Sequence, residues 1–110
     1  MMDNNKRFSG IMPAMITPID ASNNFRAQAA EAVIRLLSAS PIRGFYINGA
    51  TGEGPVLPEA TRMEMAELSV DLMQGRGVII NHIGAPDMEQ TLRLARHAQR
   101  IGCDAISSVL

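Results

Sequence analysis

The chain has 110 residues, of which 46% are hydrophobic and 19% are charged, and its formal net charge is −1. This is the size and composition of one ordinary globular domain, which excludes a collagen-like or disordered chain. A near-neutral charge argues against nucleic-acid binding, and no apolar run approaches the roughly 18 residues of a membrane helix. The polar opening MMDNNKRFSG lacks a signal-peptide core, and the single cysteine, Cys103, cannot form an internal disulfide. We therefore expect a cytoplasmic protein with no nucleic-acid or membrane partner.

Four short apolar runs recur along the chain at a spacing of about 30 residues, the size of a β-α-β unit. They are GIMPAMIT (10–17), GFYIN (44–48), GVIINHI (77–83) and DAISSVL (104–110). Their nearly continuous apolar character is typical of strands that are buried on both faces of a parallel sheet. The runs therefore predict four parallel strands.

The three intervening segments carry apolar residues at helical spacing. The predicted buried stripes are Ala29, Val33, Leu36 and Leu37, then Met65, Leu68 and Leu72, and then Thr91, Leu94, Ala95, Ala98 and Ile101. Asp87 and Gln90 have the spacing of a capping box, and Gly102 stands where the third helix should end. The predicted order is β-α-β-α-β-α-β with right-handed crossovers.

Two architectures fit this order: an open, doubly wound sheet, and part of a (β/α)8 barrel, which needs about 250 residues when complete. Both place functional loops after the carboxyl ends of the strands. The loop NGATGEG (48–54) follows the second predicted strand and is the candidate site in either case.

Nucleotide phosphate fits this loop poorly. From Gly49 the spacing is G-x-x-G-x-G rather than the dinucleotide pattern G-x-G-x-x-G, and Pro55 and Pro58 delay the next helix. A P-loop would need a lysine after its last glycine, and the only lysine in the chain is Lys6.

A small carboxylate fits the loop better. The backbone N–H groups of Ala50 and Thr51, with the Thr51 hydroxyl, can form a compact anion nest. We expect Gly49 and Gly52 to supply unusual backbone dihedral angles, and Glu53 to tie the loop to neighbouring N–H groups. The alternative is a glycine-rich turn that binds no ligand.

The segment GFYINGATGEG resembles the Gly-x-x-Gly-(Ser/Thr)-Thr-Gly-Glu segment of the pyruvate-dependent class I aldolases, the family of N-acetylneuraminate lyase and dihydrodipicolinate synthase. GIMPAMITPID is similar to the first strand of that family. VIINHIG and RIGCDAISSVL resemble the lyase branch more closely, because the synthase branch usually has Gly-Thr-Gly around His82 and Gly84. The resemblance covers Gly10 to Leu110. It implies that residues 1–110 are an incomplete (β/α)8 barrel, strands 1–4, with an N-terminal arm at 1–9.

The resemblance also implies an activity: a lysine Schiff base, without another cofactor, that makes or breaks a carbon–carbon bond between pyruvate and a sugar-type aldehyde. Gly49, Ala50 and Thr51 match the segment that holds the pyruvate carboxylate. Ala50 replaces a hydroxyl residue that joins a tyrosine proton relay in the family. The family further implies a homo-oligomer, a tetramer. Two alternatives are a synthase-like condensation of pyruvate with an amino-aldehyde and a non-catalytic carboxylate-binding or scaffold remnant.

The chain lacks the chemical centre that the resemblance implies. Family members carry the Schiff-base lysine on the sixth strand and the acid–base tyrosine on the fifth, whereas Lys6 lies in the polar N-terminal arm. We therefore expect the chain to be inactive by itself. His82 is open to either a pocket role or a structural one. The other chemical side chains are expected to be structural or solvated: Tyr46 in packing, Cys103 as a small buried hydrophobe, and His97, Glu64 and Glu67 at the surface.

Overall fold

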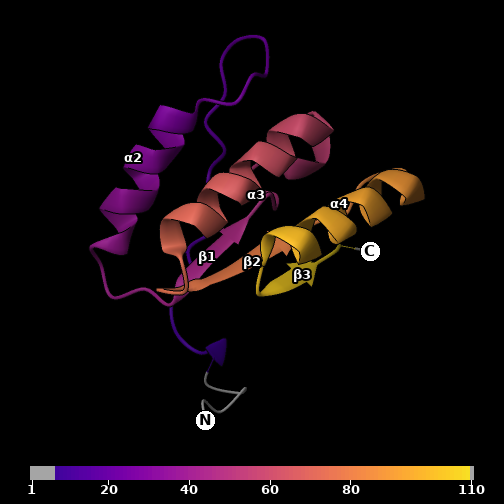
Figure 1. Ribbon diagram of the computed structural model, residues 1–110. Helices are drawn as coiled ribbons and strands as arrows, with labels where there is room; N and C mark the ends of the chain where they lie inside the picture. Colours follow the sequence, from indigo (N-terminus) through magenta and orange to yellow (C-terminus); the bar gives the residue numbers. More distant parts are fainter. Residues whose placement is uncertain (1–6, 110) are drawn as a thin grey trace.

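The computed structural model describes residues 7–109, which form a three-stranded parallel sheet with the order β1-β2-β3. The strands are β1 (Gly44–Ile47), β2 (Val78–His82) and β3 (Ala105–Ser107), and the helices are α2 (Ala27–Ser38), α3 (Glu59–Met73) and α4 (Met88–Ile101). All three helices cover the same face of the sheet (Figure 1). The predicted α/β class with parallel strands is therefore confirmed, and helices on both faces, as a doubly wound sheet requires, do not occur within 7–109.

The first predicted strand, 10–17, is not a strand of this sheet. The segment runs beside β1, where the Met15 N–H donates to the Tyr46 carbonyl at 2.8 Å and the Tyr46 N–H donates to the Pro13 carbonyl at 2.9 Å. Only an isolated parallel bridge, Ala14 with Tyr46, results. On the amino side of this bridge Pro13 has no N–H to donate to the Gly44 carbonyl, and the Arg43 N–H donates instead to the Ile11 carbonyl at 2.7 Å.

The main core lies between the sheet and α2 and α3. Alternate residues of β1 and β2 face the helices. With residues of α2 and α3 and one residue of the 10–17 segment they form a buried cluster: Met15, Ala30, Ile34, Phe45, Ile47, Met65, Ala66, Met73 and Ile79. Burying a side chain of the size of Ile or Phe contributes roughly 1.5–3 kcal/mol. A smaller cluster of Ile83, Leu94 and Ala98 lies under α4.

The helical stripes are confirmed in part. Leu94 and Ala98 are buried as predicted, but Leu36 is 72% exposed, and the buried residues of α2 are Ala30 and Ile34. In α3, Met65 is buried, but Leu68 and Leu72 are only half-buried. The core face of α3 is filled instead by a mixture that apolar periodicity does not reveal: Thr61, Arg62, Met65, Ala66, Ser69 and Met73.

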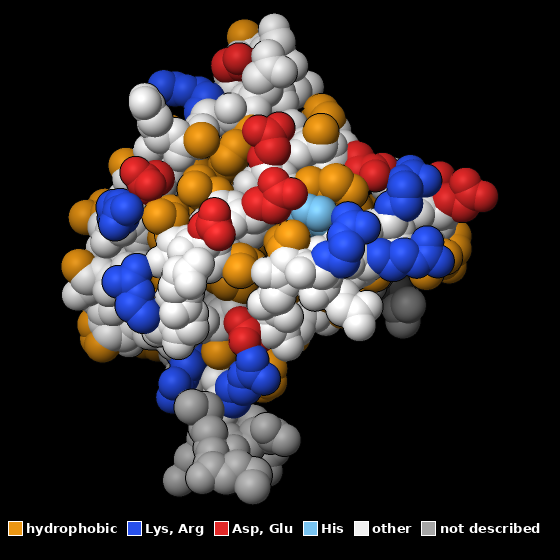
Figure 2. All heavy atoms as spheres, in the orientation of Figure 1, with side chains coloured by type: hydrophobic (Ala, Val, Ile, Leu, Met, Phe, Trp, Pro, Cys, Tyr) orange, Lys and Arg blue, Asp and Glu red, His pale blue; other side chains and the backbone are white. Residues whose placement is uncertain are grey.

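Local signals set the ends of α4, and charges join it to α3. The Asp87 side chain accepts from the Glu89 N–H at 3.1 Å, and Gly102 ends the helix in the left-handed conformation with φ of 89°. Figure 2 shows acidic side chains gathered over α3 and basic ones over α4. Arg93 and Glu59 form an ion pair of 2.9 Å across this seam. Within 7–109, no helix has the length and apolar character needed to cross a membrane.

Candidate functional site

The loop after β1 is one closed turn. The Glu53 N–H donates to the Ala50 carbonyl at 3.0 Å, and the Gly54 N–H donates to the Gly49 carbonyl at 3.1 Å. This nested pair of bonds is the Schellman pattern, and Glu53 takes the left-handed conformation that it requires, with φ of 58°. A short 3-10 turn, η1 (Gly54–Val56), follows. The carbonyl groups of Gly49 and Ala50 are therefore occupied inside the loop.

The donors of the same turn are not occupied. The N–H groups of Ala50 and Thr51 and the Thr51 hydroxyl make no hydrogen bond with another residue of the described chain. Ala50 and Thr51 are both exposed, whereas Gly49 is buried. A turn that uses its acceptors internally and leaves donors available suits an anion.

The glycines of the loop serve close packing rather than unusual dihedral angles, so that part of the sequence prediction is wrong. Neither Gly49 nor Gly52 has a positive φ. A Cβ on Gly49 would lie 2.3 Å from Cε1 of Tyr46, and one on Gly52 would lie 2.8 Å from the carbonyl oxygen of Met15.

The left-handed conformations fall on Asn48, with φ of 60°, and on Glu53. Asn tolerates this region better than most residues because its short polar side chain bonds locally. The predicted tie from the Glu53 carboxylate is also wrong: this exposed side chain makes no hydrogen bond with the described residues. Glu53 instead closes the turn through its backbone N–H.

A buried group of polar residues, here called the strand-end cluster, lies behind the loop and comprises Asn48, Arg62, Asn81 and His82. Each is 3% exposed or less. The Arg62 guanidinium donates to the carbonyl groups of His82 at 2.8 Å and Gly84 at 2.9 Å. The Asn48 amide nitrogen donates to the Arg62 carbonyl at 3.1 Å and to Oδ1 of Asn81 at 3.0 Å.

Sequence reasoning did not single out Asn48, Arg62 or Asn81. A signal was present for Arg62, which stands three residues before Met65 and therefore on the core face of α3. Asn48 and Asn81 are the polar residues at the ends of two apolar runs, where parallel strands bring them to one edge of the sheet.

His82 is neutral near pH 7. Its burial and the charge of Arg62 lower its pKa, and a backbone hydrogen bond at Asn48 acts in the opposite direction. The Val109 N–H donates to Nε2 of His82 at 3.2 Å, which places the proton of the neutral ring on Nδ1. Burial also lowers the pKa of Arg62, whereas the charge of Glu59 raises it.

His82 opens onto a hollow of about 220 Å³ at the same edge of the sheet as the loop. Its walls are Pro55, His82, Gly84, Ala85, Pro86 and Val109. Pro55 belongs to η1, which begins at Gly54, the last residue of the NGATGEG loop. His82 is therefore both a wall of this hollow and part of a hydrogen-bonded cluster.

Two further hydroxyl groups lie at this edge. The Thr17 hydroxyl is fully buried without a partner among residues 7–109, and it would be 3.0 Å from a Cβ on Gly52. The Tyr46 hydroxyl donates to the Ser107 hydroxyl at 2.9 Å, while its ring packs on Gly49. Tyr46 is therefore a packing residue, as predicted, and it supports the candidate loop directly.

The other side chains considered in the sequence differ in where the structure places them. His97 is 3% exposed, and its Nε2 lies 2.8 Å from Oε1 of Glu67, so the predicted surface position is wrong. The neighbouring arginines in the sequence suggest an exposed helix face, but His97 lies at the seam between α3 and α4. Burial raises the pKa of Cys103 to about 11, so its thiol stays protonated, as expected of a half-buried hydrophobe. Glu64 is exposed, as predicted, and Lys6 lies outside the described residues.

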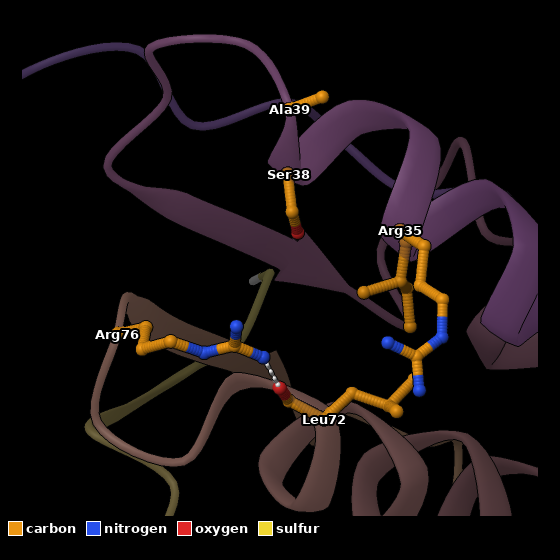
Figure 3. Close-up of a pocket in the computed structure, with 6 residues that line it drawn as sticks. Arg35, Ser38, Ala39, Leu72 and Arg76 are labelled. Carbon is orange, nitrogen blue, oxygen red and sulfur yellow. Dashed lines mark hydrogen bonds between the residues drawn. The ribbon is translucent and has the colours of Figure 1, made fainter.

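A second hollow, of about 280 Å³, lies between the last turns of α2 and α3, at the opposite end of the sheet (Figure 3). Arg35 and Arg76 line it, and the Arg76 guanidinium donates to the Leu72 carbonyl. Basic side chains at helix carboxyl ends compensate the helix dipole, which accounts for both arginines. None of the loops at the carboxyl ends of the strands contributes to it. No three metal-ligating side chains converge anywhere in 7–109.

The arrangement is shared with known proteins. The sequence model of the Dihydrodipicolinate synthetase family matches residues 7–110. The N-acetylneuraminate lyase of Citrobacter koseri is 34% identical over 104 residues, which are 94% of this chain and 35% of that protein. The crystal structure of N-acetylneuraminate lyase from Mycoplasma synoviae has a TM-score of 0.88 at 32% identity, covering 96% of this chain and 37% of that one.

A dihydrodipicolinate synthase from Agrobacterium tumefaciens has a TM-score of 0.89 at 29% identity, covering 96% of this chain and 36% of that one. The chain thus spans about a third of the length of the relatives that it matches. Its strands and helices correspond to part of the (β/α)8 barrels of these aldolases. The match over residues 7–110 shows that the chain belongs to the dihydrodipicolinate synthetase family.

Proposed function

We propose that the NGATGEG loop binds the carboxylate of pyruvate and that the chain contributes this subsite to a Schiff-base lyase or aldolase. The observation that carries the proposal is the imbalance of the loop. Its carbonyl groups at Gly49 and Ala50 are occupied, whereas the N–H groups of Ala50 and Thr51 and the Thr51 hydroxyl have no partner in the described chain. Family membership supports pyruvate as the carboxylate.

The strength of such a site depends on its donors. An ordinary hydrogen bond contributes roughly 0.5–1.5 kcal/mol net, and one to a charged acceptor contributes about twice as much. Two N–H groups and one hydroxyl therefore orient a carboxylate without holding it tightly. His82 adds no positive charge because its pKa is lowered. Tight retention would require a covalent linkage to a lysine.

The reaction supported best is the lyase one, in which a carbon–carbon bond between pyruvate and a sugar-type aldehyde is made or broken. His82 and Gly84 stand where the synthase branch usually has Gly-Thr-Gly, which favours the lyase over condensation with an amino-aldehyde. The hollow beside His82 adjoins the loop, and we propose that it holds the part of the substrate beyond pyruvate.

A second candidate is carboxylate binding without catalysis. The sequence supports it at two points: the only lysine is Lys6, and Ala50 removes the hydroxyl through which a tyrosine relay would pass. Under this proposal the 110-residue chain binds pyruvate but does not turn it over. Both candidates use the same loop, and they differ only in whether bond cleavage or formation takes place after pyruvate has bound.

The substitution Thr51→Val tests the shared subsite. We expect pyruvate affinity to fall about tenfold, because one hydroxyl donor to a charged acceptor is lost. Titration calorimetry with sodium pyruvate measures the change. Ser40→Ala is the matched control, since it removes an exposed hydroxyl at the opposite end of the sheet. Equal affinity in Thr51→Val and the parent would show that the loop is only a turn.

A further inference from the structure

Arg62 is buried and makes no hydrogen bond to an acidic side chain of residues 7–109, although the charge of Glu59 raises its pKa. It is 1% exposed, and its guanidinium forms no ion pair within the described chain. Its charge is compensated instead by two main-chain carbonyl groups, those of His82 and Gly84. Its Nε atom is also buried and has no hydrogen-bond partner among residues 7–109.

Stability alone is a poor reason for this arrangement. A buried charge carries a large desolvation cost, and well-packed apolar residues are often as stable or more stable in its place. The neighbouring core positions of α3 hold Met65, Ala66 and Met73, so an apolar residue at 62 would continue the same face. A buried guanidinium on this face of α3 therefore indicates that Arg62 holds neighbouring segments in place.

The position of Arg62 joins two loops. Through its side chain it holds the backbone that follows β2, at His82 and Gly84. Through its own carbonyl it accepts from the Asn48 side chain, which begins the NGATGEG loop in the left-handed conformation. Resting on the proposed function, we propose that Arg62 is a positioning residue, which fixes the carboxylate-binding loop against the loop after β2 without touching the ligand.

Arg62 also acts on His82. Its Nη2 lies 3.5 Å from Nδ1 of His82, and this positive charge is one cause of the lowered pKa of the ring. A neutral ring can accept from the Val109 N–H, and that contact forms part of the hollow beside the loop. Substitutions at residue 62 can therefore separate the effect of its charge on the His82 pKa from the effect of its hydrogen bonds on the two loops.

Two variants make this separation. Arg62→Lys keeps the charge but cannot span two carbonyl groups with a planar fork, whereas Arg62→Met removes both. We expect both variants to speed amide hydrogen exchange over Asn48–Gly54, and only Arg62→Met to raise the His82 pKa toward 6.5 in an NMR titration. Arg93→Lys, an exposed arginine in an ion pair, is the control and should change neither quantity.

A second pair of variants tests the link from the loop side, should either Arg62 variant fail to fold. Asn48→Gly keeps the left-handed backbone but deletes the side-chain amide, which donates to the Arg62 carbonyl and to Oδ1 of Asn81. Glu53→Gly adds the same freedom at the other left-handed position while losing an unbonded side chain. Exchange over the loop should rise more in Asn48→Gly than in Glu53→Gly. An equal rise in both would overturn the link.

Pyruvate titration then separates this inference from the function beneath it. If the parent binds sodium pyruvate, Arg62→Lys should bind it roughly tenfold more weakly, as expected for the loss of one or two well-aligned donors. If the parent shows no binding, the proposed function fails, while the exchange comparison still decides the role of Arg62. Folded Arg62 variants with exchange and affinity equal to those of Arg93→Lys would overturn the inference.

Discussion

Two buried regions behind the same sheet are built in opposite ways. The main core joins Phe45, Ile47 and Ile79 to apolar residues of α2 and α3, and it is predominantly apolar. The strand-end cluster is entirely polar, and its buried atoms Asn48 Oδ1 and Arg62 Nε, like Thr17 Oγ1, have no hydrogen-bond partner among residues 7–109. A buried polar group without a partner costs about 1–3 kcal/mol. The core therefore stabilises the fold, whereas the cluster has a stability cost that fits the positioning role proposed for Arg62.

The largest effect on stability should come from the core. Phe45 is fully buried, so Phe45→Ala should lower the free energy of unfolding by about 3–5 kcal/mol, and Ile79→Val by about 0.5–1.5 kcal/mol. Urea unfolding followed by circular dichroism measures both. In the folded Ile79→Val variant, pyruvate affinity should match the parent. A marked loss of affinity there would contradict the separation of the two regions.

The second largest effect should come from the open edges of the sheet, through self-association of the chain. The 10–17 segment and β3 both lie at edges, and Ile11 is 66%, Ile16 50% and Ile106 53% exposed. Unpaired edges and exposed apolar side chains promote association. We expect the folded 110-residue chain to self-associate through these edges, as measured by sedimentation velocity. A folded monomer would contradict this expectation.

The cluster should give the chain a pH dependence that the apolar core cannot. The pKa of His82 is lowered from 6.5 in the folded state by burial and by Arg62, so the unfolded state binds the proton more readily. The stability that the folded state keeps by holding His82 neutral is fully present above pH 6.5, and it is lost as the pH falls toward the pKa of His82 in the folded state. We expect His82→Gln to flatten the fall in unfolding free energy just below pH 6.5, as measured by urea titration at several pH values. An unchanged slope would show that His82 is not the titrating group.

The smallest effect should come from Ala50→Ser. The proposed contact at Ala50 is its backbone N–H, so a serine side chain should leave pyruvate affinity within about twofold of the parent. Calorimetry measures this, and in a complete enzyme the same change should preserve or raise turnover by restoring a relay hydroxyl. A large loss of affinity would mean that the carboxylate lies against the Ala50 methyl group instead.

The sequence predicts those features of the fold that depend on local spacing. The 30-residue rhythm of apolar runs, the stop at Gly102 and the place of the NGATGEG loop after a strand are all correct. The prediction of a first strand is confirmed only in part: 10–17 pairs with β1 through one parallel bridge, and apolar character does not register that Pro13 lacks the N–H needed to extend the pairing on its amino side.

The site is less predictable because it depends on contacts between distant segments. The glycines identify the loop, but their close approach to Tyr46 and Met15 cannot be read from spacing. Arg62 joins residues that are 14 and 22 positions away, Asn48 and Gly84, through one carbonyl and one guanidinium. Such a link requires α3 to be docked on the sheet, which no local pattern encodes.

The most direct measurement is an NMR titration of the chain with sodium pyruvate, tracking the amide signals of Ala50 and Thr51. We expect saturable shifts at these two residues, smaller ones at Asn48, and none at Arg35 and Arg76 beside the hollow at the opposite end of the sheet. In Thr51→Val the same shifts should saturate at about tenfold higher pyruvate. Shifts that are absent at Ala50 and Thr51, or that occur instead at Arg35 and Arg76, would contradict the assignment of this loop as the carboxylate site.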